Sequence, residues 1–189
     1  MRRLISLILA TALLSLLCAC SSGTNPEDLA QSVAEEYNKA GSISMVMDLT
    51  ADYGDKVYDY KLKYEGTADD GTLTVSEPEN IAGLSAHLSE DGITLKYDDV
   101  SLETGALSPD GLSPLDAVPA MLGSWTAGYP EECVFESIEG DDFVSVGYPL
   151  TDTEYLRTWF DSETLLPYMT EISSNGKVVI KCSFENVII

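Results

Sequence analysis

The chain has 189 residues with 32 acidic and 10 basic side chains, which give a formal net charge of −22 at pH 7. A body of this charge repels nucleic acid and anionic lipid head groups, so nucleic-acid binding is excluded. Its one histidine, His87, cannot assemble a multi-histidine metal site. We find no Gly-x-Ser-x-Gly elbow and no phosphate-binding glycine loop.

The first residues have the order of an export signal. Arg2 and Arg3 form a positive start, an apolar run extends over residues 4–17, and a small residue, Ala19, precedes Cys20. The apolar run is shorter than the roughly 18 residues that usually span a bilayer. We therefore expect residues 1–19 to be a signal peptide and not a membrane-spanning anchor.

The segment Leu17-Cys18-Ala19-Cys20 resembles the lipobox of bacterial lipoproteins. This resemblance implies cleavage before Cys20 and a diacylglyceryl group on its thiol, and two acyl chains suffice for stable membrane anchoring. It also implies a location on the extracytoplasmic face of a bacterial membrane. Residues 20–25 would form the lipidated cysteine and a short tether.

Removal of the signal takes both of its arginines away, so the charge of the remaining 170 residues is −24. That length fits one domain with a sizeable core, which we expect to cover residues 26–189. The acidity is typical of a solvated surface. The pairs Glu131-Glu132 and Asp141-Asp142 lack the alternating spacing of a calcium loop, and we interpret them as solvated turns rather than as a metal or hydrolase site.

A helix is predicted directly after the tether. Asn25 can cap it with Pro26 at the first position, and Leu29, Val33 and Tyr37 then recur on one face. We expect this face to pack on the chain's own sheet rather than on a partner.

From residue 42 the apolar period changes to two, which is typical of strands. Apolar residues alternate with mostly polar ones over 43–51 and again over 58–64, so we predict two long antiparallel strands with one apolar face. Shorter strands are predicted around Leu73 and Val75, over 82–88 and over 93–97.

A break follows at 108–125. Ser113 and Pro114 open a helical pattern in which Pro119 lies inside, and we expect a kinked or two-part helix there. Five further strands are predicted at 133–138, 143–148, 154–160, 165–173 and 177–187, the last two joined by an Asn175-Gly176 hairpin turn.

Cys133 and Cys182 are the cysteines left for redox chemistry. If the last five strands form a simple meander, the first and fifth lie about four spacings of ~4.8 Å apart. A disulfide needs Cα atoms within roughly 7 Å, so we predict two separate thiols, or at most an intermolecular bridge through Cys133.

The apolar face of the first two strands combines methionines with tyrosines. Methionine adapts to irregular apolar ligands, and tyrosine joins an apolar ring to a polar tip. This face is either an ordinary core under the helices or a lipid-accepting cavity. The candidates for lining such a cavity are Met45, Met47, Leu49, Tyr58, Tyr60, Leu62 and Tyr64.

The order of elements resembles the LolA/LolB/RseB fold, and the C-terminal stretch carries the most telling local match: Trp159-Phe160-Asp161, Thr164-Leu165-Leu166-Pro167, Asn175-Gly176 and Phe184-Glu185-Asn186-Val187. The resemblance implies an α+β fold: a curved antiparallel sheet, an unclosed half-barrel, with an N-terminal helix and a helical lid insertion. Carriers of this family bind acyl chains in the half-barrel, whereas sensor relatives bind protein partners. An arginine found inside some carriers has no clear match here.

Two functions are therefore expected from the sequence. One is a membrane-tethered, non-enzymatic lipoprotein that binds an acyl chain or other apolar ligand without a cofactor. The alternative is a protein-binding scaffold, for instance an accessory partner of a cell-envelope enzyme, with a dry core.

Overall fold

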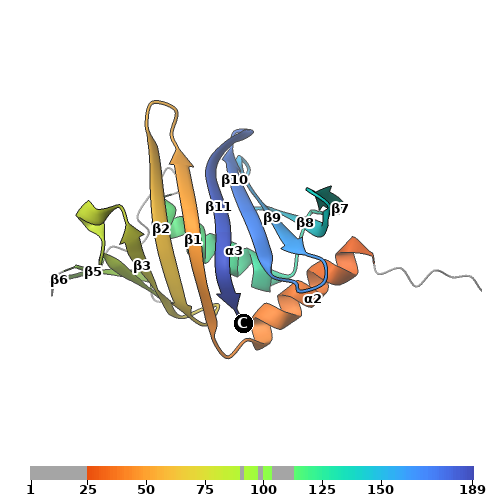
Figure 1. Cartoon of the computed structure of the whole chain (residues 1–189), viewed down its shortest axis with the longest axis horizontal. Coiled ribbons are helices and arrows are strands. Elements are labelled where there is room, and N and C mark those ends of the chain that lie inside the picture. The colour runs from red at the N-terminus through yellow and green to blue at the C-terminus, as the bar shows by residue number, and fades with distance from the viewer. Residues whose placement is uncertain (1–24, 90–91, 98–99, 104–112) are drawn as a thin grey trace, which may run out of the picture.

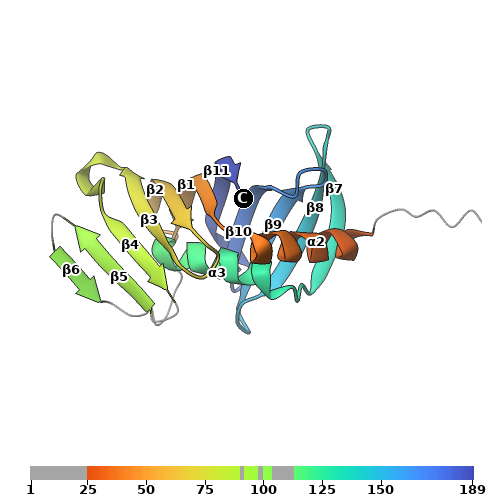
Figure 2. The same ribbon diagram turned by 90° about the horizontal axis from the view of Figure 1, so that it is seen from below.

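The computed structural model describes residues 25–89, 92–97, 100–103 and 113–189. The predicted signal, Cys20 and residues 21–24 of the tether lie outside these described residues. Within them, eleven strands form one antiparallel sheet with two α-helices on one face (Figures 1 and 2). The strands are β1 (Ile43–Asp52), β2 (Val57–Gly66), β3 (Gly71–Glu77), β4 (Ser85–Ser89), β5 (Gly92–Tyr97), β6 (Val100–Glu103), β7 (Glu132–Ile138), β8 (Asp141–Pro149), β9 (Glu154–Asp161), β10 (Pro167–Ser174) and β11 (Lys177–Ile188).

The sheet consists of two meanders, β1 to β6 and β7 to β11, which are joined by pairing between the first and last strands of the chain. Its order is β6-β5-β4-β3-β2-β1-β11-β10-β9-β8-β7, so β1 pairs with β11, and β6 and β7 form the two edges. Because these edges do not pair with each other, the sheet stays an unclosed half-barrel. This confirms the fold class that the sequence predicts.

Helix α2 (Pro26–Lys39) begins as predicted. The Asn25 side chain accepts a hydrogen bond from the backbone N–H of Asp28 at 2.7 Å, and Val33 and Tyr37 are buried. The helix packs against α3 (Pro114–Ala127), where the Asn38 side chain donates to the Thr126 carbonyl at 2.7 Å. Neither described helix is long and apolar enough to cross a membrane.

The prediction of a second helix that contains Pro119 is confirmed, and its two-part form is wrong. Helix α3 runs unbroken from Pro114 to Ala127 with Pro119 inside it. Proline removes one backbone hydrogen bond. Buried side chains on both sides of Pro119 offset this loss, because the same face packs on the sheet throughout: Ala117, Val118, Met121, Leu122 and Trp125.

Two strand predictions also need correction. The strand expected over 82–88 begins only at Ser85, because residues Glu79–Ile81 form a 3-10 turn and Ala82 caps it. Strand β6 (Val100–Glu103) was not predicted, since four residues are too few to establish an alternating pattern. The five C-terminal strands are confirmed within two residues at each end.

The hairpin between β10 and β11 has the predicted turn. Asn175 and Gly176 both have positive φ, 52° and 78°, as a two-residue hairpin turn requires. The meander places β8, β9 and β10 between the strands that hold Cys133 and Cys182. Both cysteines are free thiols, which confirms the prediction of separate thiols.

Candidate ligand-binding face

The candidate residues lie on the inner face of the sheet, defined here as the side that α2 and α3 cover. In the register of β1 and β2, Met45 lies opposite Tyr64, and Met47 opposite Leu62. The same register places Leu49 opposite Tyr60. All seven candidates therefore share one side of two neighbouring strands, as the alternation predicts.

We call these seven residues the apolar row, and the exposed fraction of their side chains changes steeply along it. Met45 and Met47 are 0% exposed, and Leu49, Leu62 and Tyr64 are also buried. Tyr58, at the start of β2, is 41% exposed. The row is thus closed at one end and open at the other.

Tyr64 lies at the buried end of the row, where both its ring and its hydroxyl make defined contacts. Its ring lies directly over Gly71 on β3, where an added Cβ would be 2.3 Å from the tyrosine hydroxyl oxygen. The hydroxyl donates to the carbonyl of Thr67. Burial raises the pKa of Tyr64 to about 12. The absence of a side chain at Gly71 therefore leaves room for the ring, and burial keeps its hydroxyl protonated at physiological pH.

The open end is a group of three tyrosines, Tyr53, Tyr58 and Tyr60, which we call the mouth. The ring centroids of Tyr58 and Tyr60 are 6.5 Å apart, and those of Tyr53 and Tyr58 are 6.3 Å apart. Burial, then Tyr60 and the Asp116 carboxylate, raise the pKa of Tyr53. Because Asp116 lies in the first turn of α3, the N-terminal end of that helix lies within electrostatic range of Tyr53.

Trp125 holds the other end of α3 against the sheet. Its ring makes edge contacts with Tyr37, Phe160 and Phe184, with centroids 5.2, 5.4 and 5.5 Å away. Its indole N–H donates to the hydroxyl of Thr158 at 2.9 Å. The helix is therefore fixed at this end by both apolar and polar contacts.

Two buried threonines extend this polar contact, and sequence reasoning missed them. The hydroxyls of Thr158 and Thr170 are 2.7 Å apart, and both side chains are 0% exposed. Thr158 lies between Leu156 and Phe160 on the inward side of β9. The sequence does hold a signal for this contact. Thr158 is a polar residue at an inward position, and a buried tryptophan needs a hydrogen-bond acceptor.

Two tyrosines, Tyr37 on α2 and Tyr148 on β8, carry their hydroxyls into the core between the helices and the sheet. Among the described residues, the hydroxyls of Tyr37 and Tyr148 are buried without a hydrogen bond. Burial raises the pKa of both groups, so they stay protonated at physiological pH.

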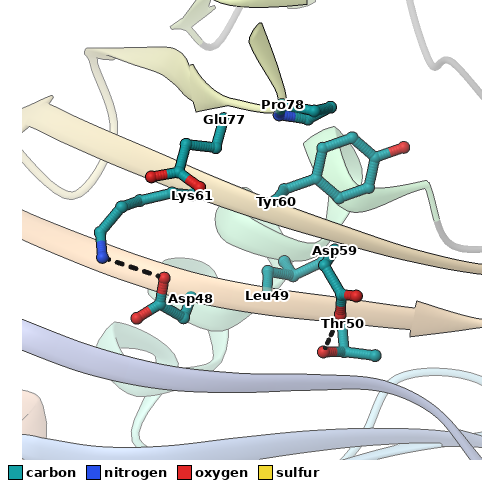
Figure 3. Close-up of a pocket in the computed structure, with 8 residues that line it drawn as sticks. All are labelled: Asp48, Leu49, Thr50, Asp59, Tyr60, Lys61, Glu77 and Pro78. Carbon is teal, nitrogen blue, oxygen red and sulfur yellow. Dashed lines mark hydrogen bonds and ion pairs between the residues drawn. The ribbon is translucent and has the colours of Figure 1, made fainter.

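A cavity of about 290 Å³ borders the candidate row but opens on the opposite, outer face (Figure 3). On that face Lys61 pairs with Asp48 at 3.2 Å, and the Thr50 hydroxyl donates to Asp59 at 2.7 Å. The charged residues that line the cavity are Asp48, Asp59, Lys61 and Glu77. This lining does not suit an apolar ligand.

The remaining candidates for chemistry lie at the surface. The His87 side chain is partly exposed, with Nε2 3.7 Å from Asp70 Oδ2. In the part of the chain that the structure describes, no three histidine, cysteine or carboxylate residues are placed to hold a metal ion.

Comparison with known proteins bears on the fold. No protein-family model and no curated protein match the chain. Among solved structures, a domain from Vibrio parahaemolyticus named for outer membrane lipoprotein sorting has a TM-score of 0.52 at 10% identity, covering 86% of this chain and 92% of that one. An uncharacterized conserved protein from Thermus thermophilus has a TM-score of 0.51 at 8% identity, covering 82% and 86%.

A LolA superfamily protein from Nitrosomonas europaea has a TM-score of 0.49 at 13% identity and covers 85% of this chain and 93% of that chain. At these identities the likeness concerns the fold. The chain shares the fold of the Vibrio domain and of the Thermus protein, and its half-barrel with two helices agrees with the architecture that the order of elements predicts.

Proposed function

We propose that the chain is an extracytoplasmic lipoprotein that holds an acyl chain or a similar apolar ligand on the inner face of its half-barrel and catalyses no reaction. The observation that carries this proposal is the gradient of exposure along β2. Tyr58 at the mouth is 41% exposed, whereas Leu62 and Tyr64 on the same side are buried. A binding face for a chain-like apolar molecule needs such an entrance beside an apolar interior.

The chemistry of the row supports this class of ligand. Met45 and Met47 are unbranched and can repack around an irregular chain. The tyrosines of the mouth combine apolar rings with polar tips, which suits the boundary between water and an acyl chain. The Vibrio domain with this fold is named for outer membrane lipoprotein sorting, which fits a lipid-related role.

Membrane attachment in this proposal depends on Cys20. The lipobox-like segment 17–20 supports lipidation of that cysteine. Helix α2 begins at Pro26, and the five residues 21–25 reach roughly 17 Å when extended. The half-barrel would therefore lie close to the membrane surface.

A second function, a protein-binding scaffold with a dry interior, is favoured by a different observation. Met45 and Met47 have no surface accessible to water, so no water-sized space borders them. In this alternative the row is simply the packed core, and the partner would bind elsewhere.

Binding of a fluorescent fatty acid to the soluble form, residues 21–189, separates the two functions. The proposal predicts saturable binding that Tyr58→Glu weakens by roughly tenfold or more, because a carboxylate at the entrance is costly to desolvate. Tyr129→Glu is the matched control, since Tyr129 is 86% exposed and lies outside the row. Absence of binding, or equal loss in both variants, would contradict the proposal.

A further inference from the structure

Strand β7 is an edge of the described sheet, and neither a lysine nor a proline protects it against pairing. It covers Glu132–Ile138 and pairs with β8 on one side, without a register shift, and no described strand pairs with its other side. Natural edge strands are often protected by charged side chains, lysine above all, or by a proline, a bulge, short length or a covering helix. Strand β7 carries two glutamates, Glu132 and Glu136, and helix α2 contacts it. Strand β7 has neither lysine nor proline and is seven residues long, whereas the opposite edge, β6, has four.

The charged side chains of β7 are held in place by its neighbours. The Arg157 guanidinium on β9 forms ion pairs with Glu132 and Glu136. The Trp159 indole N–H donates to Glu136 at 2.9 Å. These contacts hold β7 in an extended form and neutralise part of its charge. Because β7 is already ordered, binding of a second strand would cost little conformational entropy in β7.

Between these anchored carboxylates, β7 exposes apolar side chains. Val134 is 38% exposed and Phe135 is 47% exposed, and because they are consecutive in a strand they point to opposite faces. Apolar groups are thus available on both sides of the edge. An added strand could contact them with alternate residues.

A cavity of about 390 Å³ lies beside the end of this edge. It is lined by Phe135, Glu136, Ser137, Asp142 and Ser162. Within the described residues the hydroxyl oxygen of Ser162 is buried and makes no hydrogen bond. Glu136 is already paired with Arg157 and Trp159, so the Asp142 carboxylate and the unpaired Ser162 hydroxyl oxygen are the groups that suit the cavity to a side chain that donates hydrogen bonds and carries positive charge.

We propose that β7 binds an extended strand of a partner protein, which adds to the sheet edge and places a lysine or arginine side chain in this cavity. The charge of −24 expected for the mature chain favours a basic partner. It disfavours a second copy, because two such bodies repel each other. This surface is separate from the apolar row and does not depend on the proposed function.

The test uses the full-length chain in nonionic detergent and a short fluorescein-labelled peptide of alternating valine and threonine with a lysine at each end. The proposal predicts saturable binding by fluorescence anisotropy. The same peptide with glutamate ends should bind roughly tenfold more weakly or not at all. A peptide N-methylated at alternate residues keeps its charge but loses its edge hydrogen bonds, and it should not bind.

Two variants and one control locate the site. Val134→Pro should abolish peptide binding, while Val100→Pro on the opposite edge, at a residue that is 68% exposed, should leave it unchanged. Asp142→Asn should weaken binding of the lysine peptide. It should also reduce the ratio of the affinities for the lysine peptide and the glutamate peptide.

Three results would overturn the proposal. One is absence of binding by the lysine peptide. Another is binding that survives both N-methylation and Val134→Pro, which would indicate general attraction to an acidic surface. The third is a dimer in light scattering that Val134→Pro dissociates, which would assign the edge to a second copy.

Discussion

The buried end of the apolar row and its mouth are built from the same alternating strands, yet their environments differ. Met47 on β1 is fully buried, whereas Tyr58, two pairs away on the same face, is 41% exposed. Trp125 fixes the C-terminal end of α3 to the sheet, while the N-terminal end, at Asp116, lies within electrostatic range of Tyr53 at the mouth. In Figure 2 the helices lie across the middle and one half of the sheet, and β5 and β6 extend beyond them.

This difference shows that an alternating pattern identifies the inner face but not how it is used. Packing requires both a sheet and a layer that covers it. The end under Trp125 has that layer, so its side chains act as core. The mouth is the part of the row where side chains can both meet solvent and reach the core.

The largest effect on this comparison is expected from Trp125→Ala. It removes three aromatic contacts and the hydrogen bond to Thr158, and should lower the free energy of unfolding by about 3 to 5 kcal/mol. Urea unfolding measures the loss. Tyr129→Ala, at a residue that is mostly exposed, should change stability by less than about 0.5 kcal/mol. A similar loss in both variants would mean that Trp125 does not anchor α3.

The next largest effect is expected when tryptophan is introduced at each end of the apolar row in turn. Met47→Trp overpacks the closed end and should cost about 1 to 3 kcal/mol. Tyr58→Trp at the mouth should cost less than about 0.5 kcal/mol, because the side chain can extend into solvent. Thermal unfolding of both variants gives the difference. If Met47→Trp folds with full stability, the closed end contains space and is itself a cavity.

The smallest expected effect concerns pH and Tyr64. Its folded-state pKa is about 12, above the ordinary value of 10, so its stabilising effect is complete below pH 10 and falls as pH rises toward 12. Urea unfolding at pH 9 and pH 11 should show lower stability at the higher pH. Tyr64→Phe should make this fall smaller but not remove it, because burial also raises the pKa of Tyr37 and Tyr148. An unchanged pH dependence in Tyr64→Phe would show that the hydroxyl stays accessible to water.

Local signals predicted most of the fold. The Asn25 cap, the alternation of β1 and β2 and the Asn175-Gly176 turn each depend on neighbouring residues, and each was found where expected. The elements that were missed depend on distant contacts. Strand β6 exists through its pairing with β5, and the continuity of α3 across Pro119 depends on burial against the sheet.

The candidate face was only partly predictable for the same reason. Alternation correctly grouped Met45, Met47, Tyr58 and Tyr60 on one side, but their exposure depends on where α3 crosses them. Thr158 and Thr170 look like ordinary strand residues until Trp125 is placed beside them. The anchored edge of β7 likewise needs Arg157 and Glu136, which are far apart in sequence.

Native mass spectrometry of the full-length chain, purified from its own membrane, tests ligand binding most directly. We expect a population whose mass exceeds that of the lipidated chain by one acyl-containing molecule. Tyr58→Glu should lose this population, and Tyr129→Glu should retain it. A single species with no added mass in the unmodified protein, under conditions that keep it folded, would contradict the proposal and favour the scaffold with a dry core.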